Sequence, residues 1–487
     1  MAKQSKKFKF NIKFRLSFLV FSVLYIHTAS ATDYNKGVTL SFENAIKTAQ
    51  KNDPWLMGNV HKQNAIELMS QAANTLPDPM VSISLANLPV NGFDFAQEGM
   101  TQAKFGVAQL FPRGDSLAIK SGQLKTQSEA LPFQRANREG QVAVTVGSLW
   151  LDVYRVQQSI ALIEKNRSLF EQLAEVAQVS YSSALGKTRQ QDIVRSQLEL
   201  TRLDDRLNVL TQQQNRYQGM ISQWLSQFSR VESSMDSAIS ASDFSLHNII
   251  THPKLPEIAL INADLVWQQQ WLKPMALLPY FSYHPAVLAV EKKIAATSAG
   301  ISLAEQKYKA QWGVNASYGY RADDAMGSSR ADLFSVGVTF DLPLFTENKQ
   351  DKERESAIYE SESIKTEKIL LLRELMASYA SAKGQLVSLK QRQDLYKNKL
   401  LPQVHDQAQA SLSAYTNDDG DFSEVVRSRI AVLNSEIDEL TLNVEEQKIR
   451  LELNYLFMGN LNTASSHGSK IINNSGQVAV VSELINE

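Results

Sequence analysis

The 487-residue chain has a formal net charge of −1 and contains no cysteine, which excludes several classes of function. Without cysteine there are no disulfides, thiolate metal sites or thiol nucleophiles, and no acyl anchor on a cysteine is expected. Because acidic and basic residues balance and no long basic run occurs, nothing points to nucleic acid as a partner.

The first 31 residues have the pattern of a secretory signal peptide. Basic residues precede the apolar run Leu16–Ile26, and Ala29-Ser30-Ala31 supplies a small-x-small cleavage site before Thr32. A transmembrane anchor is the weaker interpretation, because this run has 11 residues and a spanning helix needs about 20. No other stretch is long and apolar enough for such a helix, so we expect any membrane crossing to use strands.

Two helices and a strand hairpin are predicted next. Ser41 can cap a short helix, and a second helix is expected from Pro54 to about Leu76, before Pro77-Asp78-Pro79. Apolar residues then recur at every second position from Met80 and again from Phe105 to Phe111. This period of two predicts two strands joined by a loop.

The second half repeats the hairpin over residues 314–321 and 334–342. An apolar face opposite a polar or tiny face fits a half-buried soluble strand, or a barrel strand with lipid outside and water inside. The strand length of about 9–11 residues matches a tilted membrane strand. Two hairpins cannot close a barrel, so the membrane interpretation requires several chains to share one.

Long coiled-coil helices are predicted after each hairpin, because apolar residues recur there in alternating steps of three and four. Such rows begin at Val146, Ile193, Leu372 and Val426. The region from Asp115 to Leu185 would measure roughly 105 Å as one helix. We expect Pro132, Gly140 and Gly147 to interrupt it.

Several landmarks recur at a nearly constant offset, which indicates a duplicated unit. Asp192-Ile-Val-Arg195-Ser and Glu424-Val-Val-Arg427-Ser lie 232 residues apart, and Pro112 and Pro343, each ending a second strand, lie 231 apart. We therefore predict a signal peptide (1–31), a first repeat (32–225), a connector (226–282), a second repeat (283–459) and a polar tail (460–487). The connector is expected to pack against the outside of the coiled coils.

The sequence gives little support for an enzyme. Apart from His27 in the signal region, the six histidines are scattered without metal-ligand spacing, and there is no phosphate loop, serine elbow or close His-Glu motif. Carboxylate pairs such as Asp204-Asp205 and Glu445-Glu446 lie beside apolar rows and are interpreted as solvated helix faces. We expect no catalytic residue, no cofactor and no metal site.

The two loops that join the coiled-coil helices carry the most informative polar residues. Thr188 with Gln191, and Asp421 with Glu424, have the spacing of a capping box. Capping explains Asp192 and Glu424, but it leaves Arg195 and Arg427 unexplained. Each arginine follows one of these acids by three residues, which is the spacing of an i,i+3 pair. The cluster Asp418, Asp419 and Asp421 is equally well read as an ordinary acidic turn or as part of a cation-favouring ring.

The order of these features resembles the outer-membrane efflux protein family typified by TolC, over roughly Val38 to Gly459. The helix openings Asn52-Asp53-Pro54 and Tyr283-His284-Pro285, the turns at Pro112 and Pro343, and Gly186 before Asp192 carry the resemblance. Leu76-Pro77-Asp78-Pro79, Asn87-Leu88-Pro89-Val90 and Phe111-Pro112-Arg113-Gly114 are similar to the heavy-metal branch. The displaced glycine in the second tip, at 420, is a departure from the pattern.

The resemblance implies an α+β membrane protein in which each repeat contributes a β-hairpin and a long coiled-coil hairpin. Three chains would form a twelve-stranded β-barrel in the outer membrane of a Gram-negative bacterium, continued by a periplasmic α-helical barrel. A periplasmic adaptor would contact Ala184, Leu185, Gly186, Lys187 and Thr188, and an inner-membrane pump, of the RND type, would complete the machine. The periplasmic gate would comprise Asp192, Arg195, Glu424, Arg427, Asp418, Asp419 and Asp421.

Three functions remain open at this point. The first is an efflux duct for metal ions or small toxic compounds, and the second is a duct for type I polypeptide secretion, which uses the same fold. The third is a periplasmic coiled-coil scaffold without a barrel. A scaffold has no need for the outward-facing apolar row Phe334, Val336, Val338, Phe340 and Leu342.

Overall fold

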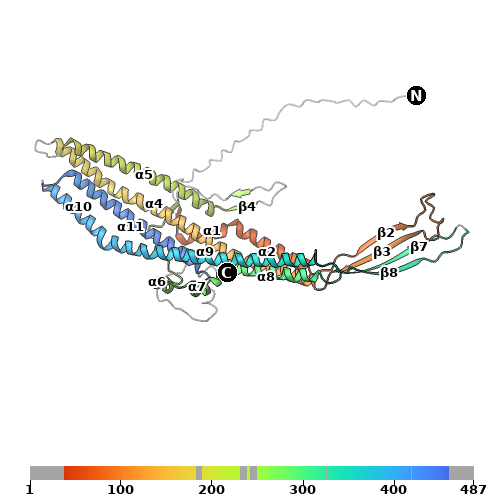
Figure 1. The fold of residues 1–487 in the computed structure, drawn as a ribbon. Coiled ribbons are helices and arrows are strands. Elements are labelled where there is room, and N and C mark those ends of the chain that lie inside the picture. The colour runs from red at the N-terminus through yellow and green to blue at the C-terminus, as the bar shows by residue number, and fades with distance from the viewer. Residues whose placement is uncertain are drawn as a thin grey trace, which may run out of the picture.

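The computed structural model describes residues 38–182, 189–230, 239–241, 249–324, 326–417 and 419–459. These residues form an elongated molecule with strands at one end and the tips of two helical hairpins at the other (Figure 1). The predicted signal peptide and the polar tail lie outside the described residues.

The first half begins with a short strand and two helices, β1 (Val38–Leu40), α1 (Phe42–Asn52) and α2 (Pro54–Ala72). As predicted, Ser41 caps α1, accepting a hydrogen bond from the Asn44 amide at 3.2 Å. Asp53 caps α2, with Pro54 in the first turn, where a missing N–H costs nothing. The second helix ends four residues before the expected Leu76.

The hairpin β2 (Met80–Ala86) and β3 (Gln102–Phe111) follows, then α3 (Ser116–Ser128), α4 (Ala130–Ser182) and α5 (Gln190–Leu225). The expected interruptions at Pro132, Gly140 and Gly147 are wrong. The helical region breaks at Glu129 instead, which places Pro132 in the first turn of α4, where proline is tolerated. A Cβ at Gly140 or Gly147 would lie 2.7 Å from Met458 or Leu451, so both glycines admit close packing by the chain's C-terminal helix region.

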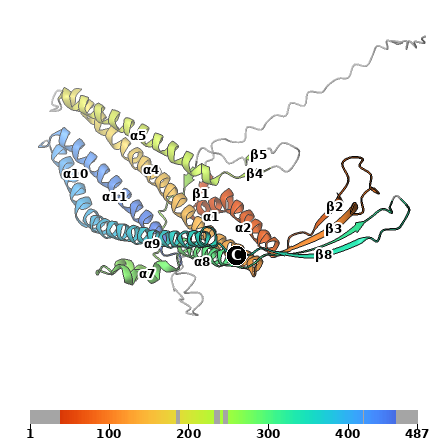
Figure 2. The ribbon, with the colours of Figure 1, turned by 45° about the vertical axis from the view of Figure 1, so that its right-hand side comes forward.

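The second half repeats the order with α8 (Pro285–Gln306), β7 (Trp312–Tyr320), β8 (Leu333–Phe340), α9 (Gln350–Leu395), α10 (Leu401–Thr416) and α11 (Phe422–Leu456). A single π-helical turn, η1 (Tyr396–Leu400), joins α9 to α10 just before Pro402. Proline cannot donate the usual helical hydrogen bond, and α10 curves away from the line of α9 (Figure 2).

The connector forms β4 (Phe228–Arg230), β5 (Ile239–Ala241), β6 (Ile249–Thr251), α6 (Ala263–Trp267) and α7 (Pro274–Ser282). Strand β6 pairs in parallel with β1, so the connector and the beginning of the described chain share a two-stranded sheet. Buried Leu265 and Val266 join the same apolar cluster as Leu386 of α9. The connector therefore packs against the helices, as expected.

The coiled-coil rows form the core. Val146, Val153 and Val156 of α4 are fully buried, and Leu203 and Leu210 of α5 also face the interior. In the second half the buried members of the rows include Leu375, Tyr379, Leu386, Leu389, Val426, Leu433, Ile437, Val444 and Leu451. The heptad spacing thus identified the buried faces correctly.

Within the described ranges, no helix combines the length and apolarity that a membrane span requires.

Candidate channel surfaces: the strand sheet and the helical tips

The two hairpins form one antiparallel sheet in the order β2-β3-β7-β8. The central contact pairs β3 with β7, which places Phe105 opposite Tyr318 and Gly106 opposite Ser317. Tyr318 in turn lies opposite Phe334 on β8, and Ile83 on β2 lies opposite Phe105. Residues from both halves of the chain therefore occupy common rows across the sheet.

One face of this sheet is apolar and open to the surroundings. Ile83 is 84% exposed and Phe334 is 72% exposed, although both are large apolar side chains. The same face carries Val81, Leu85, Phe105, Val107, Val314, Tyr318, Tyr320, Val336, Val338 and Phe340, all exposed. Such an extended patch is unusual for a monomer in water and marks an interaction surface.

The opposite face carries mostly small or polar residues, including Ser82, Ser84, Gly106, Asn315, Ser317, Ser335, Gly337 and Thr339. Its glycines leave room for polar side chains of neighbouring strands to lie flat. A Cβ on Gly106 would meet the Ser82 hydroxyl at 2.7 Å, and one on Gly313 would meet the Thr339 hydroxyl at 2.6 Å. The two faces therefore differ strongly in polarity through the middle of the sheet, whereas Met80, Leu110 and Leu333 add apolar side chains to the second face at the strand ends.

The outermost strands β2 and β8 each pair with one neighbour, so this sheet has two open edges. Unpaired backbone N–H and C=O groups at such edges need a partner wherever water is absent.

The predicted strand-to-helix turns at Pro112 and Pro343 lie close together. Arg113 forms an ion pair with Asp341, and its Nη1 donates to the Lys309 carbonyl at 2.7 Å. Asp341 also accepts from the Gln311 amide at 2.7 Å. Sequence reasoning missed this link, although each partner lies within two residues of one of the two equivalent prolines.

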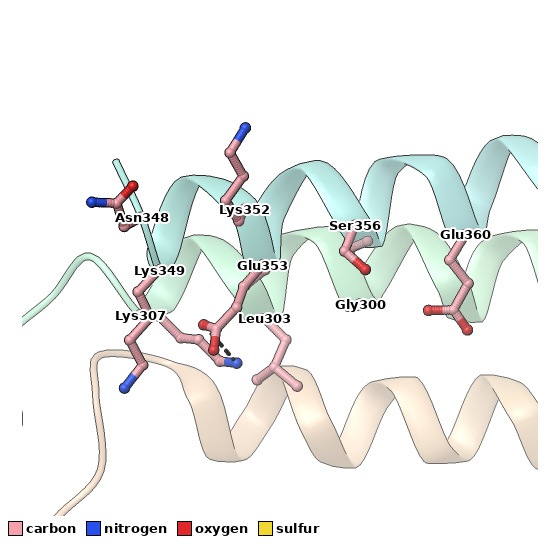
Figure 3. Close-up of a pocket in the computed structure, with 11 residues that line it drawn as sticks. Gly300, Leu303, Lys307, Asn348, Lys349, Lys352, Glu353, Ser356 and Glu360 are labelled. Atoms are coloured by element: carbon pink, nitrogen blue, oxygen red, sulfur yellow. Dashed lines mark ion pairs between the residues drawn. The ribbon is translucent and has the colours of Figure 1, made fainter. Parts of the chain in front are cut away.

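Close to the turn that joins β8 to α9, the helices α8 and α9 border a groove. Its lining includes Gly300, Leu303, Lys307, Lys349 and Glu353 (Figure 3). Lys307 and Glu353 form an ion pair across it at 3.0 Å. Arg354 and Glu305 form another pair between the same helices at 3.3 Å. These pairs are exposed, so each contributes little stability individually.

At the first tip, Asp192 caps α5 and does not pair with Arg195. Its Oδ2 accepts from the backbone amide of Arg189 at 2.9 Å, and the residue is 7% exposed. The predicted capping box of Thr188 with Gln191 is therefore wrong by one residue, because the helix begins at Gln190 with Arg189 as the N-cap residue. The expected Asp192–Arg195 pair is also wrong, since the carboxylate turns back toward the helix start.

At the second tip, the acid and the arginine do pair. Arg427 Nη1 lies 2.6 Å from Glu424 Oε2, and Gln407 of α10 donates to the other carboxylate oxygen at 3.4 Å. Glu424 is therefore not the second half of a capping box. Asp421 alone provides the cap, accepting from the Ser423 amide at 2.9 Å.

Asp421 also brings the two tips into electrostatic contact. The hydrogen bond from the Ser423 amide is the main cause that lowers the pKa of the Asp421 carboxyl, and the positive charges of Arg189 and Arg195 lower it further. Arg195, which lacks an ion pair with Asp192, is thus close enough to act on the other hairpin of the same chain.

The displaced glycine of the second tip has a packing role. A Cβ at Gly420 would lie 2.5 Å from the Tyr415 nitrogen and 2.8 Å from the Ala414 carbonyl carbon. Asp419 also returns toward α10, its amide donating to the Ala414 carbonyl at 3.0 Å. The expected adaptor contact, Ala184, Leu185, Gly186, Lys187 and Thr188, lies outside the described residues, as does Asp418.

No group of three or more His, Asp or Glu side chains in the described part of the chain has an arrangement that could hold a metal ion.

Comparison with known proteins identifies the fold. No family model and no curated protein matches the sequence. Among solved structures, the chain is similar to CusC, with a TM-score of 0.64, 14% identity, and coverage of 86% of this chain and 92% of that one. It is also similar to the outer-membrane channel OprN, with a TM-score of 0.66, 13% identity, and coverage of 86% and 90%.

A third similar structure is the CmeC outer-membrane channel of Campylobacter jejuni, with a TM-score of 0.64, 10% identity, and coverage of 92% of this chain and 94% of that one. At these identities the likeness concerns the fold alone. The predicted combination of strand hairpins with long helical hairpins is confirmed, and the chain has the TolC-like outer-membrane channel fold.

Proposed function

We propose that this protein is the outer-membrane exit duct of a tripartite efflux system in a Gram-negative bacterium. The observation that carries the proposal is the sheet, which presents exposed Ile83 and Phe334 on one face and Ser82 and Ser317 on the other. Lipid is a suitable environment for the first face, and a water-filled lumen is suitable for the second. The long helices then extend from the sheet into the periplasm.

A homotrimer would remove the open edges of the sheet. Three chains of four strands give a twelve-stranded barrel in which β2 of one copy pairs with β8 of the next. The helices support the same arrangement, because α5 carries an exposed apolar stripe of Val194, Leu198, Val209 and Met220. Their spacing of 4, 11 and 11 residues keeps them on one side of the helix, where a neighbouring copy would cover them.

The partners of the duct are a periplasmic adaptor and an inner-membrane pump of the RND type. The first tip, Ala184 to Thr188, is the proposed adaptor contact. Its cargo would be metal ions or small toxic compounds, and the heavy-metal branch rests on the motifs around Pro77, Pro89 and Pro112. Replacing Gly186 by a bulky residue should abolish efflux and leave the trimer intact.

The proposed gate lies at the helical tips and comprises Asp192, Arg195, Glu424, Arg427, Asp418, Asp419 and Asp421. Two observations support it. The Glu424–Arg427 pair is exposed and can exchange partners, with Arg427 63% exposed. Arg195 acts electrostatically on Asp421 of the other hairpin, so charges of the two tips already interact within one copy.

A duct for type I polypeptide secretion remains a second candidate, because it uses the same fold. A periplasmic scaffold accounts less well for the sheet, since it gives no reason for a continuous apolar face such as Phe334, Val336 and Val338.

Membrane fractionation and native mass measurement test the proposal. The mature chain should be recovered from outer membranes and should migrate as a trimer in detergent. A soluble periplasmic protein would favour the scaffold, and a detergent-extracted monomer with a closed barrel would contradict the shared barrel. Loss of resistance to a metal or drug on deletion would separate efflux from secretion.

A further inference from the structure

Lys104 is the only charged residue in β2, β3, β7 and β8, the four strands of the sheet. It lies in the row of small and polar residues, because its neighbours in register are Ser84 on β2 and Gly319 on β7. The next residue, Phe105, belongs to the exposed apolar face. The ammonium group of Lys104 therefore leaves the sheet on the side opposite Phe105.

The surroundings of Lys104 leave its positive charge uncompensated. In the described part of the chain, no acceptor lies within hydrogen-bonding distance of its ammonium group, and no carboxylate lies within 4.0 Å. A Cβ at Gly319 would collide with the Gln102 side chain, so Gln102 fills the space over this glycine. Neither neighbour in register, Ser84 or Gly319, offers Lys104 a carboxylate for an ion pair.

Acidic residues do occur near the outer end of the sheet, but they lie in the loops. Asp94 accepts from the Ala96 amide at 2.9 Å, and Asp324 accepts from the Ser328 amide at 2.8 Å. Asp332 forms a hydrogen bond with Tyr318, a residue of the apolar face. Glu98 and Asp323 complete the acids of these loops. Within the four strands, Lys104 carries the only fixed charge.

We propose that Lys104 is a selectivity-determining residue, which makes the outer part of the duct favour anionic cargo over cationic cargo of equal size. Among the proposed cargoes it therefore favours anionic toxic compounds over free metal cations. The proposal rests on the proposed duct, in which three copies would place three Lys104 side chains around one lumen. Lys104 is the third residue of β3, so this ring would lie just inside the outer mouth. Rings of fixed positive charge attract anions and repel cations during permeation.

The expected effect is moderate, because salt screens charges over about 8 Å at physiological ionic strength. At low ionic strength, removal of the three charges should lower the ratio of chloride to potassium permeability by roughly twofold.

The absence of native cysteines permits a direct test on the full-length trimer. Lys104→Cys provides a single thiol on the inferred lumen face, and Phe105→Cys is the matched control on the lipid face. Membrane-impermeant methanethiosulfonates with a trimethylammonium or a sulfonate group should label Lys104→Cys in intact cells and leave Phe105→Cys unlabelled. Failure to label Lys104→Cys would overturn the orientation and hence the proposal.

The reversal potential of labelled trimers in planar bilayers then measures the effect of charge. The cationic adduct should shift the potential toward anion selectivity and the sulfonate adduct toward cation selectivity. Because the protein is otherwise identical, the acidic tips contribute equally to both measurements. Equal reversal potentials for the two adducts would overturn the role of Lys104 and leave the duct standing. Assembled trimers that pass no current even with Arg195→Ser and Arg427→Ser, which should open the proposed gate, would contradict both the duct and the inference.

Discussion

The ammonium group of Lys383 on α9 donates a hydrogen bond to the backbone carbonyl of Gln268, at 2.9 Å, just after α6 ends. It also donates to the Leu265 carbonyl at 3.3 Å and lies 5.1 Å from the centre of the Trp271 ring. Lys383 is 3% exposed, and burial lowers the pKa of its ammonium group. One side chain thus joins the connector to the coiled coil.

Replacing Lys383 by methionine should loosen the connector. The change keeps most of the aliphatic volume and leaves the Gln268 carbonyl without its donor, at a cost of about 1–3 kcal/mol, whereas the Leu265 carbonyl still accepts from the Tyr379 hydroxyl at 3.1 Å. Hydrogen exchange measured by mass spectrometry should accelerate over 263–282 and stay unchanged in α11. Lys390→Met is a control on the same helix, because Lys390 forms its ion pair with Glu446 of α11, at 2.8 Å. Unchanged exchange over 263–282 would contradict the anchoring role.

Sequence periodicity predicted the fold well, because it records which side of each helix or strand is apolar. The period of two located the strands to within two or three residues, and heptad spacing identified buried faces such as Val146 and Leu433. The break in the first long helix was misplaced for a physical reason. Pro132 and Gly140 are penalised inside an isolated helix, but a first-turn position and close packing by Met458 make them acceptable here.

The tips were harder to predict, because their polar contacts depend on where a helix starts. A shift of one residue at Arg189 turned Asp192 into a cap and removed its predicted partner Arg195. The pair Arg113–Asp341 joins turns separated by more than 200 residues. Spacing along the chain carries no direct information on such a contact.

Gly420 should be intolerant of a side chain. Gly420→Ala places a Cβ 2.5 Å from the Tyr415 nitrogen and near backbone atoms of Ala414, and a backbone cannot move away as a flexible side chain can. We expect faster hydrogen exchange across the second tip, over 412–430, in a correctly assembled trimer. Gly122→Ala is the control, because nothing lies within 4 Å of a Cβ at that helical position. Equal protection in the two variants would refute the packing role of Gly420.

His284 should make stability depend on pH. It is 0% exposed, its Nδ1 accepts from the Ala286 amide at 3.3 Å, and its Nε2 lies 3.2 Å from the Tyr455 carbonyl. Burial lowers its pKa from 6.5 to about 4. The unfolded chain therefore binds this proton at a higher pH than the folded chain does. The stability that neutral His284 provides is complete above about pH 6.5 and falls as the pH is lowered toward 4, by up to about 3 kcal/mol per chain.

Thermal unfolding of the trimer at several pH values measures this dependence. His284→Asn keeps an acceptor at the helix cap and removes the titrating ring, so its melting temperature should fall less than that of wild type between pH 7 and pH 4.5. His405→Asn serves as the control at an exposed histidine, whose side chain is 51% exposed. Parallel curves for wild type and His284→Asn would exclude His284 as the source of the dependence.

The remaining prediction concerns the resting state of the helical tips. If Arg195 and Arg427 hold neighbouring hairpins together in the trimer, replacing both by serine should raise the resting conductance and admit larger solutes. One exposed ion pair contributes at most about 1 kcal/mol. Links repeated around a trimer could add to a useful barrier, which adaptor binding would offset, and α10 could then swing outward from the bend near Pro402 without unfolding.

Single-trimer conductance in planar bilayers decides whether these arginines gate the duct or only stabilise their own helices. Arg202→Ser is a close control, because the Arg202–Glu199 pair matches Arg427–Glu424 in spacing, in its distance of 2.6 Å and in the exposure of the arginine, 64% against 63%. Arg202 lies further from the tip, so a change in conductance caused only by loss of helix stability would also appear in Arg202→Ser. If the assembled double variant has a low conductance, equal to that of Arg202→Ser, then Arg427 acts only as an intrahelical partner of Glu424. A higher conductance confined to the double variant would assign the barrier to the tip charges, because the control loses an equivalent pair without altering the tip.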